Sequence, residues 1–241
     1  MKNILITAGG TSEPVDSVRS ITNSGTGRLG SLTAEEFAKL NSVGAVYYIC
    51  SKTALKPAHD KIRIITVESV DDLKNAVESL LHSERIDVVV HSMAVSDYRV
   101  RSVSTIDRVE EALGGGVELE KALDETDLRK GGEKLSSKMG APLILLEQTP
   151  KILPCFRKLA PNAVIIGFKL LSNVSRERLF EVAKKLMTDN GCDYVLANDS
   201  AEISGDSHIG YLLGKDGSTK RLETKQEIAR SLAGVITEDN I

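Results

Sequence analysis

Apolar residues along this chain occur in short unbroken runs that alternate with stretches of helix-like spacing. In the first half the runs predict strands at residues 3–8, 45–50, 62–67 and 87–91. Between them, apolar residues at helical spacing predict helices over 30–40 and 69–81, and Ser69 is a candidate N-cap for the second helix. Runs of Val and Ile without polar interruption are typical of strands that are covered on both faces. The pattern therefore predicts a parallel sheet between layers of helices.

The alternation stops after Tyr98. Residues 100–140 are charged and are interrupted by glycines at 114–116 and 131–132, which predicts an inserted flap. After the flap the alternation returns, with strands predicted at residues 142–146, 163–168 and 193–197.

Two helices are predicted among these later strands. Thr149 and Pro150 predict a helix start, with the proline in the first helical position. Residues 175–190 predict a helix that ends at Gly191.

The C-terminal segment predicts a β-hairpin, formed by residues 208–213 and 219–223, and a last helix opened by a capping box at 224–227. We therefore expect one α/β domain over residues 1–241, with a three-layer, Rossmann-like, mostly parallel sheet, an inserted flap and a C-terminal β-hairpin. In such folds ligands bind beyond the carboxyl ends of the strands. The candidate segments are those after Ala8, Cys50, His91, Leu146, Phe168 and Ala197.

Composition excludes several classes of protein. The 241 residues are 41% hydrophobic and 27% charged, as is usual for a globular protein with its own core. A net charge of -3, without any Lys/Arg-rich run, argues against nucleic-acid binding. No apolar run approaches the roughly 18 residues of a membrane span, and the amino terminus does not resemble a signal peptide. The 3 cysteines contain no CxxC pair and fit a reducing compartment. We expect a cytoplasmic protein that binds neither nucleic acid nor a membrane.

The segment between the first strand and the first helix, residues 7–30, carries the densest chemical signal. Arg19 and Arg28 supply positive charge there. Several glycines allow close approach of the backbone to a ligand, namely Gly9, Gly10, Gly25, Gly27 and Gly30. Backbone N–H groups at such a turn and at a following helix N-terminus bind anions. The segment predicts a phosphate site, and a connection that serves only sharp turns is the alternative.

A dinucleotide site is a competing interpretation. Residues 25–30 match the GxGxxG pattern, but the first strand ends well before them, and the second strand ends without the acidic residue that holds ribose hydroxyls. Lys52 could instead take the 2′-phosphate of NADP, and Tyr48 and Lys52 have the YxxxK spacing of short-chain reductases. That pair requires a helix, whereas Tyr48 lies in a predicted strand.

Polar residues outside this segment are also candidates. Asp97 follows the strand at 87–91, where a carboxylate could hold a nucleotide or Mg²⁺, although loop aspartates commonly only form turns. Lys134 lies between glycines of the flap and could close over a triphosphate, although most such lysines are only solvated. Asn198 and Asp199 follow another strand end and are equally ambiguous. The histidines show no HxxxH or HExxH spacing, so no metal ligands are predicted.

Six motifs occur in order along the chain: ITAGGTSEPVDSVRSITNSGTGRLG, AVSDYRV, EKLSS, EQTPKIL, IGFK and DYVLAND. Together they resemble the phosphopantothenoylcysteine synthetase family, also called phosphopantothenate–cysteine ligase, and the match runs through the final helix. The resemblance implies a ligase of coenzyme A biosynthesis that joins 4′-phosphopantothenate to L-cysteine. In the implied reaction the carboxylate attacks the α-phosphate of a nucleoside triphosphate and releases pyrophosphate. The cysteine amine then displaces the nucleoside monophosphate.

The resemblance also implies roles for individual residues. Asn23 would bind the acyl group, and Arg19 would hold the phosphopantothenate, from the same subunit or from the neighbouring one. Lys134 would be the flap lysine and, with Asn23, a catalytic residue. Asp97 would bind the ribose, while residues 150–153 and Phe168 would border the base. The implied nucleotide-binding set is Gly9, Gly10, Thr11, Gly25, Thr26, Gly27, Ala94, Asp97, Lys134, Pro150, Lys151, Ile152, Leu153 and Phe168.

The chain departs from the family pattern in three places. The connection from Arg99 to Lys134 is far longer than in the commonest bacterial form. The KxKK-like flap motif keeps only Lys134, and residues 167–171 read GFKLL where that form has GFAAE, closer to the eukaryotic FKLE. CTP is the usual bacterial nucleotide and ATP the eukaryotic one. We expect CTP as co-substrate, with ATP as the alternative, together with Mg²⁺.

Many bacterial relatives are fused behind a flavin-dependent decarboxylase, whereas this chain starts directly at the synthetase strand. The resemblance therefore implies the stand-alone form, without flavin, followed in the pathway by a separate decarboxylase. It also implies a homodimer. Two other functions stay open from the residues alone: an NADP-dependent reductase and a catalytically silent nucleotide-binding protein.

Overall fold

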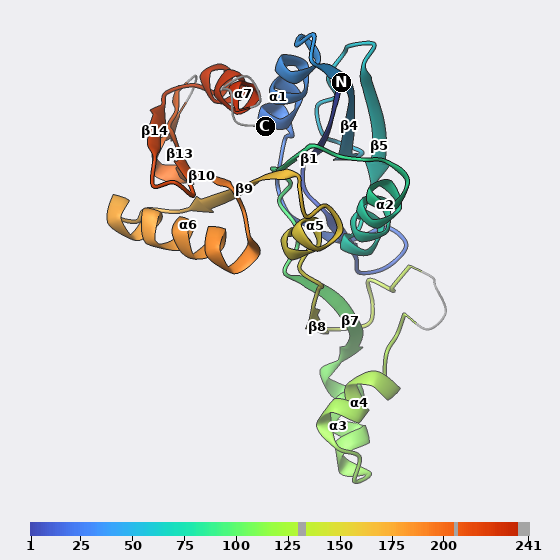
Figure 1. The fold of residues 1–241 in the computed structure, drawn as a ribbon. Coiled ribbons are helices and arrows are strands. Elements are labelled where there is room, and N and C mark those ends of the chain that lie inside the picture. The colour runs from blue at the N-terminus through green and yellow to red at the C-terminus, as the bar shows by residue number, and fades with distance from the viewer. Residues whose placement is uncertain (130–133, 205–206, 236–241) are drawn as a thin grey trace.

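The computed structural model describes residues 1–129, 134–204 and 207–235, and its centre is an eight-stranded sheet (Figure 1). In spatial order the strands are β14 (Thr219–Leu222), β13 (Gly210–Gly214), β10 (Tyr194–Asp199), β9 (Val164–Leu171), β6 (Val88–His91), β1 (Lys2–Ala8), β4 (Val43–Ser51) and β5 (Ile62–Val67). The strands from β10 to β5 run parallel, and β13 and β14 form an antiparallel hairpin beside β10.

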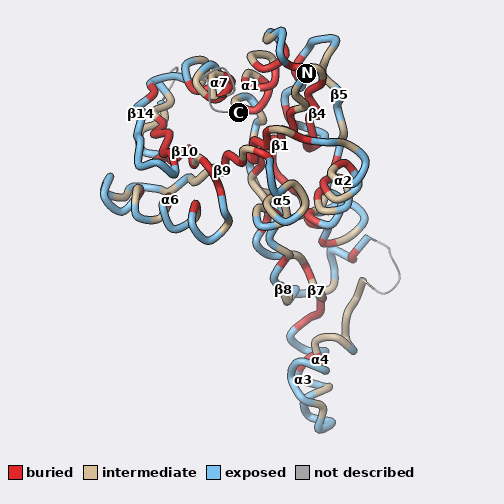
Figure 2. The backbone as a smooth tube through the Cα atoms, viewed as in Figure 1, coloured by how far each residue is buried: buried red, intermediate tan, exposed pale blue. Residues whose placement is uncertain are grey.

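Helices cover both faces of this sheet. They are α1 (Arg28–Ala38) and α7 (Lys225–Gly234) on one face, and α2 (Val70–Ser83), α5 (Leu153–Leu159) and α6 (Arg176–Asn190) on the other (Figure 1). Successive side chains of β1 point to opposite faces. Ile4 and Ile6 therefore join the core under α1 and α7, whereas Leu5 joins the core under α2, α5 and α6. Figure 2 shows the buried residues concentrated along the sheet. The predicted three-layer fold is confirmed.

The predicted helix caps are largely confirmed. The Ser69 side chain accepts a hydrogen bond from the Asp72 N–H, and the Asp72 carboxylate accepts one from the Ser69 N–H, so α2 starts with a closed capping box. Ser175 caps α6, which ends at Gly191 with a φ of 62°. The box predicted at 224–227 is only half formed, because the Glu227 carboxylate accepts from the Glu223 N–H.

Strands β7 (Tyr98–Thr105) and β8 (Pro142–Gln148) pair antiparallel outside the main sheet. With α3 (Ile106–Gly114) and α4 (Leu119–Glu125) they form an arm that projects from the body (Figure 1). The strand predicted at 142–146 is confirmed as β8, but it lies outside the main sheet and so does not resume the alternation of strands and helices there. Residues of β8 alternate between exposed and half-buried, as in a ribbon with one open face, and are not buried on both sides. The predicted flap thus begins with a strand and carries two helices.

The predicted helix start at Thr149 and Pro150 is wrong. Helix α5 begins at Leu153 and has Pro154 in its first turn. Thr149 is engaged elsewhere: its N–H donates to the Asp97 carbonyl at 3.0 Å, and its hydroxyl donates to the Ser96 carbonyl at 2.5 Å.

Short elements complete the described fold. They are the pairs β2 (Ser12–Pro14) with β3 (Ser20–Thr22) and β11 (Ile203–Ser204) with β12 (Ser207–His208), and the 3-10 turn Ser200–Glu202. The predicted C-terminal hairpin is confirmed as β13 and β14, with His208 placed in β12. In the part of the chain that the structure describes, no helix has both the length and the apolar character needed to span a membrane.

Candidate active site

The loop between β1 and α1 folds back on itself at the carboxyl edge of the sheet. The Asn23 N–H donates to the Thr11 carbonyl at 3.0 Å, which brings the two ends of the loop together. A Cβ at Gly10 would lie 1.8 Å from the Asn23 carbonyl oxygen, and one at Gly25 would lie 2.6 Å from the Gly9 carbonyl oxygen. Only glycine fits where these two backbones touch, which explains why two glycine clusters precede a single helix.

Helix α1 starts from this loop without a side-chain cap. Its N-cap is Gly27, which has a φ of 68° and no side chain to accept a hydrogen bond. The first N–H groups of a helix have no partner within the helix. They and the positive end of the helix dipole favour an anion at this position.

A cavity of about 320 Å³ opens beside this helix start. One wall is the loop, with Gly9 and residues 24–30, and residues 92–94 after β6 form its base. The opposite wall comes from β9, β10, β11, β12 and α7, through Phe168, Leu170, Asn198, Ile203, His208 and Lys225. Among the described lining residues the charged side chains are Arg28 and Lys225, both cations. The cavity therefore favours an anionic ligand.

His208 adds a neutral polar group to this cavity. Its Nδ1 is enclosed and has no hydrogen-bond partner among the described residues. Burial, and to a smaller extent the nearby charge of Lys225, lower the pKa of His208 to about 4. At neutral pH the imidazole is uncharged, and its free Nδ1 can donate or accept one hydrogen bond with a ligand, depending on the tautomer.

A chain of hydrogen bonds joins the loop to two further segments at the same edge. The Thr11 N–H donates to the Ala94 carbonyl at 3.1 Å, and the Thr11 hydroxyl donates to the Ser96 hydroxyl at 3.0 Å. Ser96 in turn accepts from Thr149. Beyond it, Asp97 and Lys151 form an ion pair at 2.5 Å with both side chains largely exposed. The segments after β1, β6 and β8 thus form one continuous edge.

The structure divides the predicted site residues into three groups. Those that line the cavity are Gly9, Gly25, Thr26, Gly27, Ala94 and Phe168. Those beside it along the same edge are Gly10, Thr11, Asn23, Asp97, Pro150 and Lys151. Two predicted residues belong to none of these groups: Ile152 is buried in the core, and Leu153 is partly buried and packs against that core.

Arg19 and Lys134 form the third group, at the base of the arm. The Arg19 guanidinium donates through Nη2 to the carbonyl of Leu135 at 2.8 Å, next to the exposed Lys134. The fold thus brings these two predicted residues together, although neither lines the cavity.

Sequence reasoning assigned no site role to several residues of the cavity, above all His208 and Lys225. They come from β12 and α7, far from the glycine loop in sequence, and no spacing links them to it. Asn198 carried a weak signal because it follows a predicted strand. It lies in the cavity wall, and its side-chain N–H donates to the Ile209 carbonyl at 2.8 Å.

The Tyr48 and Lys52 pair is not arranged as in a reductase. Tyr48 is buried in β4, and its hydroxyl donates to the Leu55 carbonyl at 2.8 Å. Burial raises its pKa well above the ordinary value. Lys52 pairs with Glu68 at 2.6 Å on the surface. In addition, the described residues contain no group of three or more His, Cys, Asp or Glu side chains that could hold a metal ion.

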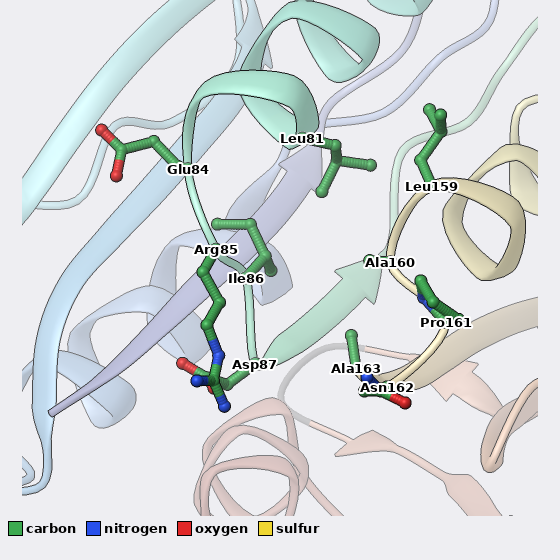
Figure 3. A pocket seen from close by; sticks show the side chains of 10 residues that line it. All are labelled: Leu81, Glu84, Arg85, Ile86, Asp87, Leu159, Ala160, Pro161, Asn162 and Ala163. Atoms are coloured by element: carbon green, nitrogen blue, oxygen red, sulfur yellow. The ribbon is translucent and has the colours of Figure 1, made fainter.

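A second cavity, of about 430 Å³, lies at the opposite edge of the sheet, between the ends of α2 and α5. Figure 3 shows its lining, with Arg85 beside Asp87 and the Ala160–Ala163 turn facing them. This is the amino end of β6 and β9, and it has no glycine loop. Since ligands of such sheets bind at the carboxyl edge, the smaller cavity is the better candidate.

Comparison with known proteins gives one family match. The family model described as DNA/pantothenate metabolism flavoprotein C-terminal domain matches residues 1–126 and 124–239. Among curated relatives, the coenzyme A biosynthesis bifunctional protein CoaBC of Thermococcus kodakarensis is 33% identical over 96% of this chain and 50% of its own length. The protein of the same name from Methanocaldococcus jannaschii is 28% identical over 95% of this chain and 49% of its own length. The chain spans about half the length of these relatives.

Solved structures agree with this match. The DNA/pantothenate metabolism flavoprotein from Streptococcus pneumoniae superimposes with a TM-score of 0.86, at 33% identity, and covers 100% of both chains. The C-terminal domain of a CoaBC protein gives a TM-score of 0.70 at 27% identity, covering 99% of this chain and 97% of that chain. A Cab2 variant in complex with phosphopantothenate-cysteine gives 0.70 at 17% identity, covering 98% and 86%, and supports the fold alone.

Proposed function

This chain belongs to the family of the DNA/pantothenate metabolism flavoprotein C-terminal domain, and we propose that it is a phosphopantothenate–cysteine ligase of coenzyme A biosynthesis. In the proposed reaction, 4′-phosphopantothenate, L-cysteine and CTP give 4′-phosphopantothenoylcysteine, CMP and pyrophosphate. The observation that carries the proposal is the cavity beside the glycine loop, whose charged lining residues, among those described, are cations. The cavity lies at the carboxyl edge of the parallel sheet, where α/β folds of this kind bind their ligands, and this position suits a nucleoside triphosphate.

The first step activates a poor acyl donor. A carboxylate oxygen of phosphopantothenate bonds to the α-phosphorus of CTP, and the bond from that phosphorus to the bridging oxygen breaks, so pyrophosphate leaves with the electron pair. The N-terminus of α1, Arg28 and Lys225 would stabilise the negative charge of the phosphates. Lys134 would add its charge from the arm, Asp97 would accept from the ribose hydroxyls, and Phe168 would border the base.

The second step forms the amide. The cysteine ammonium group first loses a proton, and the resulting amine attacks the acyl carbon. The bond between that carbon and the phosphate oxygen breaks, so CMP leaves, and the nitrogen releases a second proton as the amide forms. Negative charge builds on the carbonyl oxygen during attack, and the Asn23 amide would donate to it. Arg19, from its own or a neighbouring subunit, would hold the phosphopantothenate in place.

The remaining features of the proposal follow the family resemblance. We propose a cytoplasmic homodimer. Mg²⁺ usually reaches such sites with the phosphates of its nucleotide and needs only one or two carboxylates of the protein. The described residues offer no larger acidic cluster, so we assign no step to the metal.

Pyrophosphate release tests the proposal. Purified protein is incubated with CTP or ATP, with and without 4′-phosphopantothenate, and the product after addition of L-cysteine is identified by mass spectrometry. We expect pyrophosphate only when nucleotide and phosphopantothenate are both present, a higher rate with CTP, and phosphopantothenoylcysteine as the product. Protection against thermal unfolding by CTP without any turnover would show a silent nucleotide-binding protein instead.

A further inference from the structure

One carboxylate connects the two residues at the base of the arm. Asp16 lies in the turn between β2 and β3, and its side chain has no exposed surface. Its Oδ1 accepts from the N–H groups of Val18, at 2.9 Å, and Arg19, at 2.8 Å. Its Oδ2 accepts from the N–H of Leu135, at 3.0 Å. The same side chain thus bonds to the segment that carries Arg19 and to the segment that carries Lys134.

Arg19 completes this connection. Its Nε lies 3.4 Å from Asp16 Oδ2, and its Nη2 donates to the Leu135 carbonyl at 2.8 Å. Both backbone polar groups of Leu135 are therefore held by the β2–β3 turn. The Leu135 side chain is 5% exposed and packs with Val15 and Val103. The backbone beside Lys134 is fixed, whereas the Lys134 side chain stays exposed.

The two carboxylate oxygens of Asp16 accept hydrogen bonds from different parts of the chain. Oδ1 alone would stabilise the turn, because it accepts from residues two and three positions ahead, as in an ordinary Asx turn. Oδ2 instead bonds to a residue 119 positions away, in a different part of the fold. Hydrogen bonds from the backbone, first that of Val18, hold the pKa of Asp16 below its ordinary value. The group is therefore an ionised acceptor at neutral pH, and bonds to an ionised acceptor are the stronger kind.

We propose that Asp16 is a positioning residue of the ligase: it holds Arg19 and Lys134 at a fixed separation, so that the phosphopantothenate and the nucleotide phosphates meet in reacting geometry. The proposal rests on the proposed function, which gives those two roles to Arg19 and Lys134. Asp16 acts through them and does not touch the reacting atoms.

A double-mutant cycle tests this coupling. Asp16→Asn, Lys134→Ala and the double variant are compared by kcat for pyrophosphate release with CTP and phosphopantothenate. Loss of a charge-assisted hydrogen bond typically costs roughly tenfold, which is the fall in kcat that we expect for Asp16→Asn. In the Lys134→Ala background the same substitution should lower kcat by a smaller factor, because one of the two residues that Asp16 positions is gone while Arg19 remains. An equal fall in both backgrounds, or no fall in either, overturns the proposal.

Asp193→Asn is the matched control. Asp193 is a buried carboxylate at the amino end of β10, where it accepts from the Ile165 N–H at 2.9 Å and pairs with Arg157 at 2.7 Å. Its loss should lower the midpoint of thermal unfolding and leave kcat unchanged. If Asp193→Asn lowers kcat as much as Asp16→Asn does, the effect of Asp16 is a general loss of stability and the proposal fails.

Hydrogen exchange of the Leu135 amide gives a readout that does not need activity. The amide should be protected in the wild-type chain and in Asp193→Asn, and should exchange faster in Asp16→Asn. Free exchange in the wild-type chain overturns the proposal even if Asp16→Asn does not fold. If the wild-type chain releases no pyrophosphate with either nucleotide, the proposed function fails, and this measurement still decides whether Asp16 holds the two segments together.

Discussion

Gly10→Ala probes the loop contact that places Asn23. A Cβ at this position would lie 1.8 Å from the Asn23 carbonyl oxygen, whereas ordinary contacts begin at 3.4 Å. The new Cβ is rigidly attached to one backbone segment and the oxygen belongs to the other, so the two segments of the loop must separate by roughly 1.5 Å to restore van der Waals contact. A misplacement of about 1 Å can cost about 100-fold in rate. We therefore expect kcat/KM for pyrophosphate release to fall about 100-fold.

The same clash should lower stability by about 1–3 kcal/mol, the usual cost of overpacking. For a chain of this length that corresponds to a fall in Tm of about 2–12 °C, which differential scanning calorimetry resolves. Gly114→Ala is the control, since a Cβ at the end of α3 meets nothing within 4 Å. It should leave both kcat/KM and Tm close to the wild-type values. A folded Gly10→Ala variant with wild-type kcat/KM would refute the reasoning, because the contact between Gly10 and Asn23 would then have no bearing on the reaction.

Three further predictions follow from the site and its surroundings. Lys134→Ala should lower kcat by about tenfold or more with little change in Tm, because the exposed Lys134 side chain stabilises the charge of the phosphates but contributes little to packing. Steady-state rates and calorimetry check this, and an unchanged kcat would remove Lys134 from the site. The Asn23→Asp variant should release pyrophosphate in a first turnover but form the amide roughly 10²–10³-fold more slowly, so the acyl-nucleotide accumulates in quenched samples analysed by mass spectrometry. If a folded variant that still binds CTP forms no acyl-nucleotide, Asn23 acts in the first step instead. Burial of His91 lowers its pKa to about 4, so between pH 6.5 and 4 the unfolded chain binds a proton at this histidine more readily than the folded chain does. The unfolding free energy should therefore fall as pH drops from about 6.5 towards 4, and less so in His91→Asn, as urea titrations at several pH values would show.

The inner strands of the main sheet, such as β1 and β6, were predictable because burial on both faces leaves an unbroken apolar run. The run at 3–8 became β1, the cap predicted at Ser69 marks a real helix start, and the helix predicted over 175–190 became α6. Strand β7 gave no such signal, because Ser102 and Ser104 are buried at its inner positions. An apolar pattern identifies only those buried positions that hold apolar residues. Ser102 and Ser104 are polar residues in buried positions, so the pattern does not reveal them.

Sequence predicted one side of the cavity well and the other side poorly, where only Phe168 and the ambiguous Asn198 were candidates. The glycine pattern of residues 7–30 indicated a loop whose backbone approaches a ligand, and Gly9, Gly25 and Gly27 do line the cavity. The opposite wall is assembled by the tertiary fold. Lys225 is the first residue of a helix and His208 lies in a two-residue strand. The sequence next to each of them contains no motif that predicts a ligand site. Their place beside the loop depends on α7 packing next to α1, which no spacing along the chain reveals.

The most direct test of the central claim follows oxygen atoms through the reaction. Phosphopantothenate labelled with ¹⁸O in its carboxylate is incubated with the protein, the preferred nucleotide and L-cysteine, and the products are analysed by mass spectrometry. If the carboxylate attacks the α-phosphorus and the amine then breaks the acyl carbon–oxygen bond, the nucleoside monophosphate must carry one ¹⁸O and pyrophosphate none. Label in inorganic phosphate together with a nucleoside diphosphate, or an unlabelled monophosphate, would contradict an acyl-nucleotide intermediate and with it the proposed mechanism.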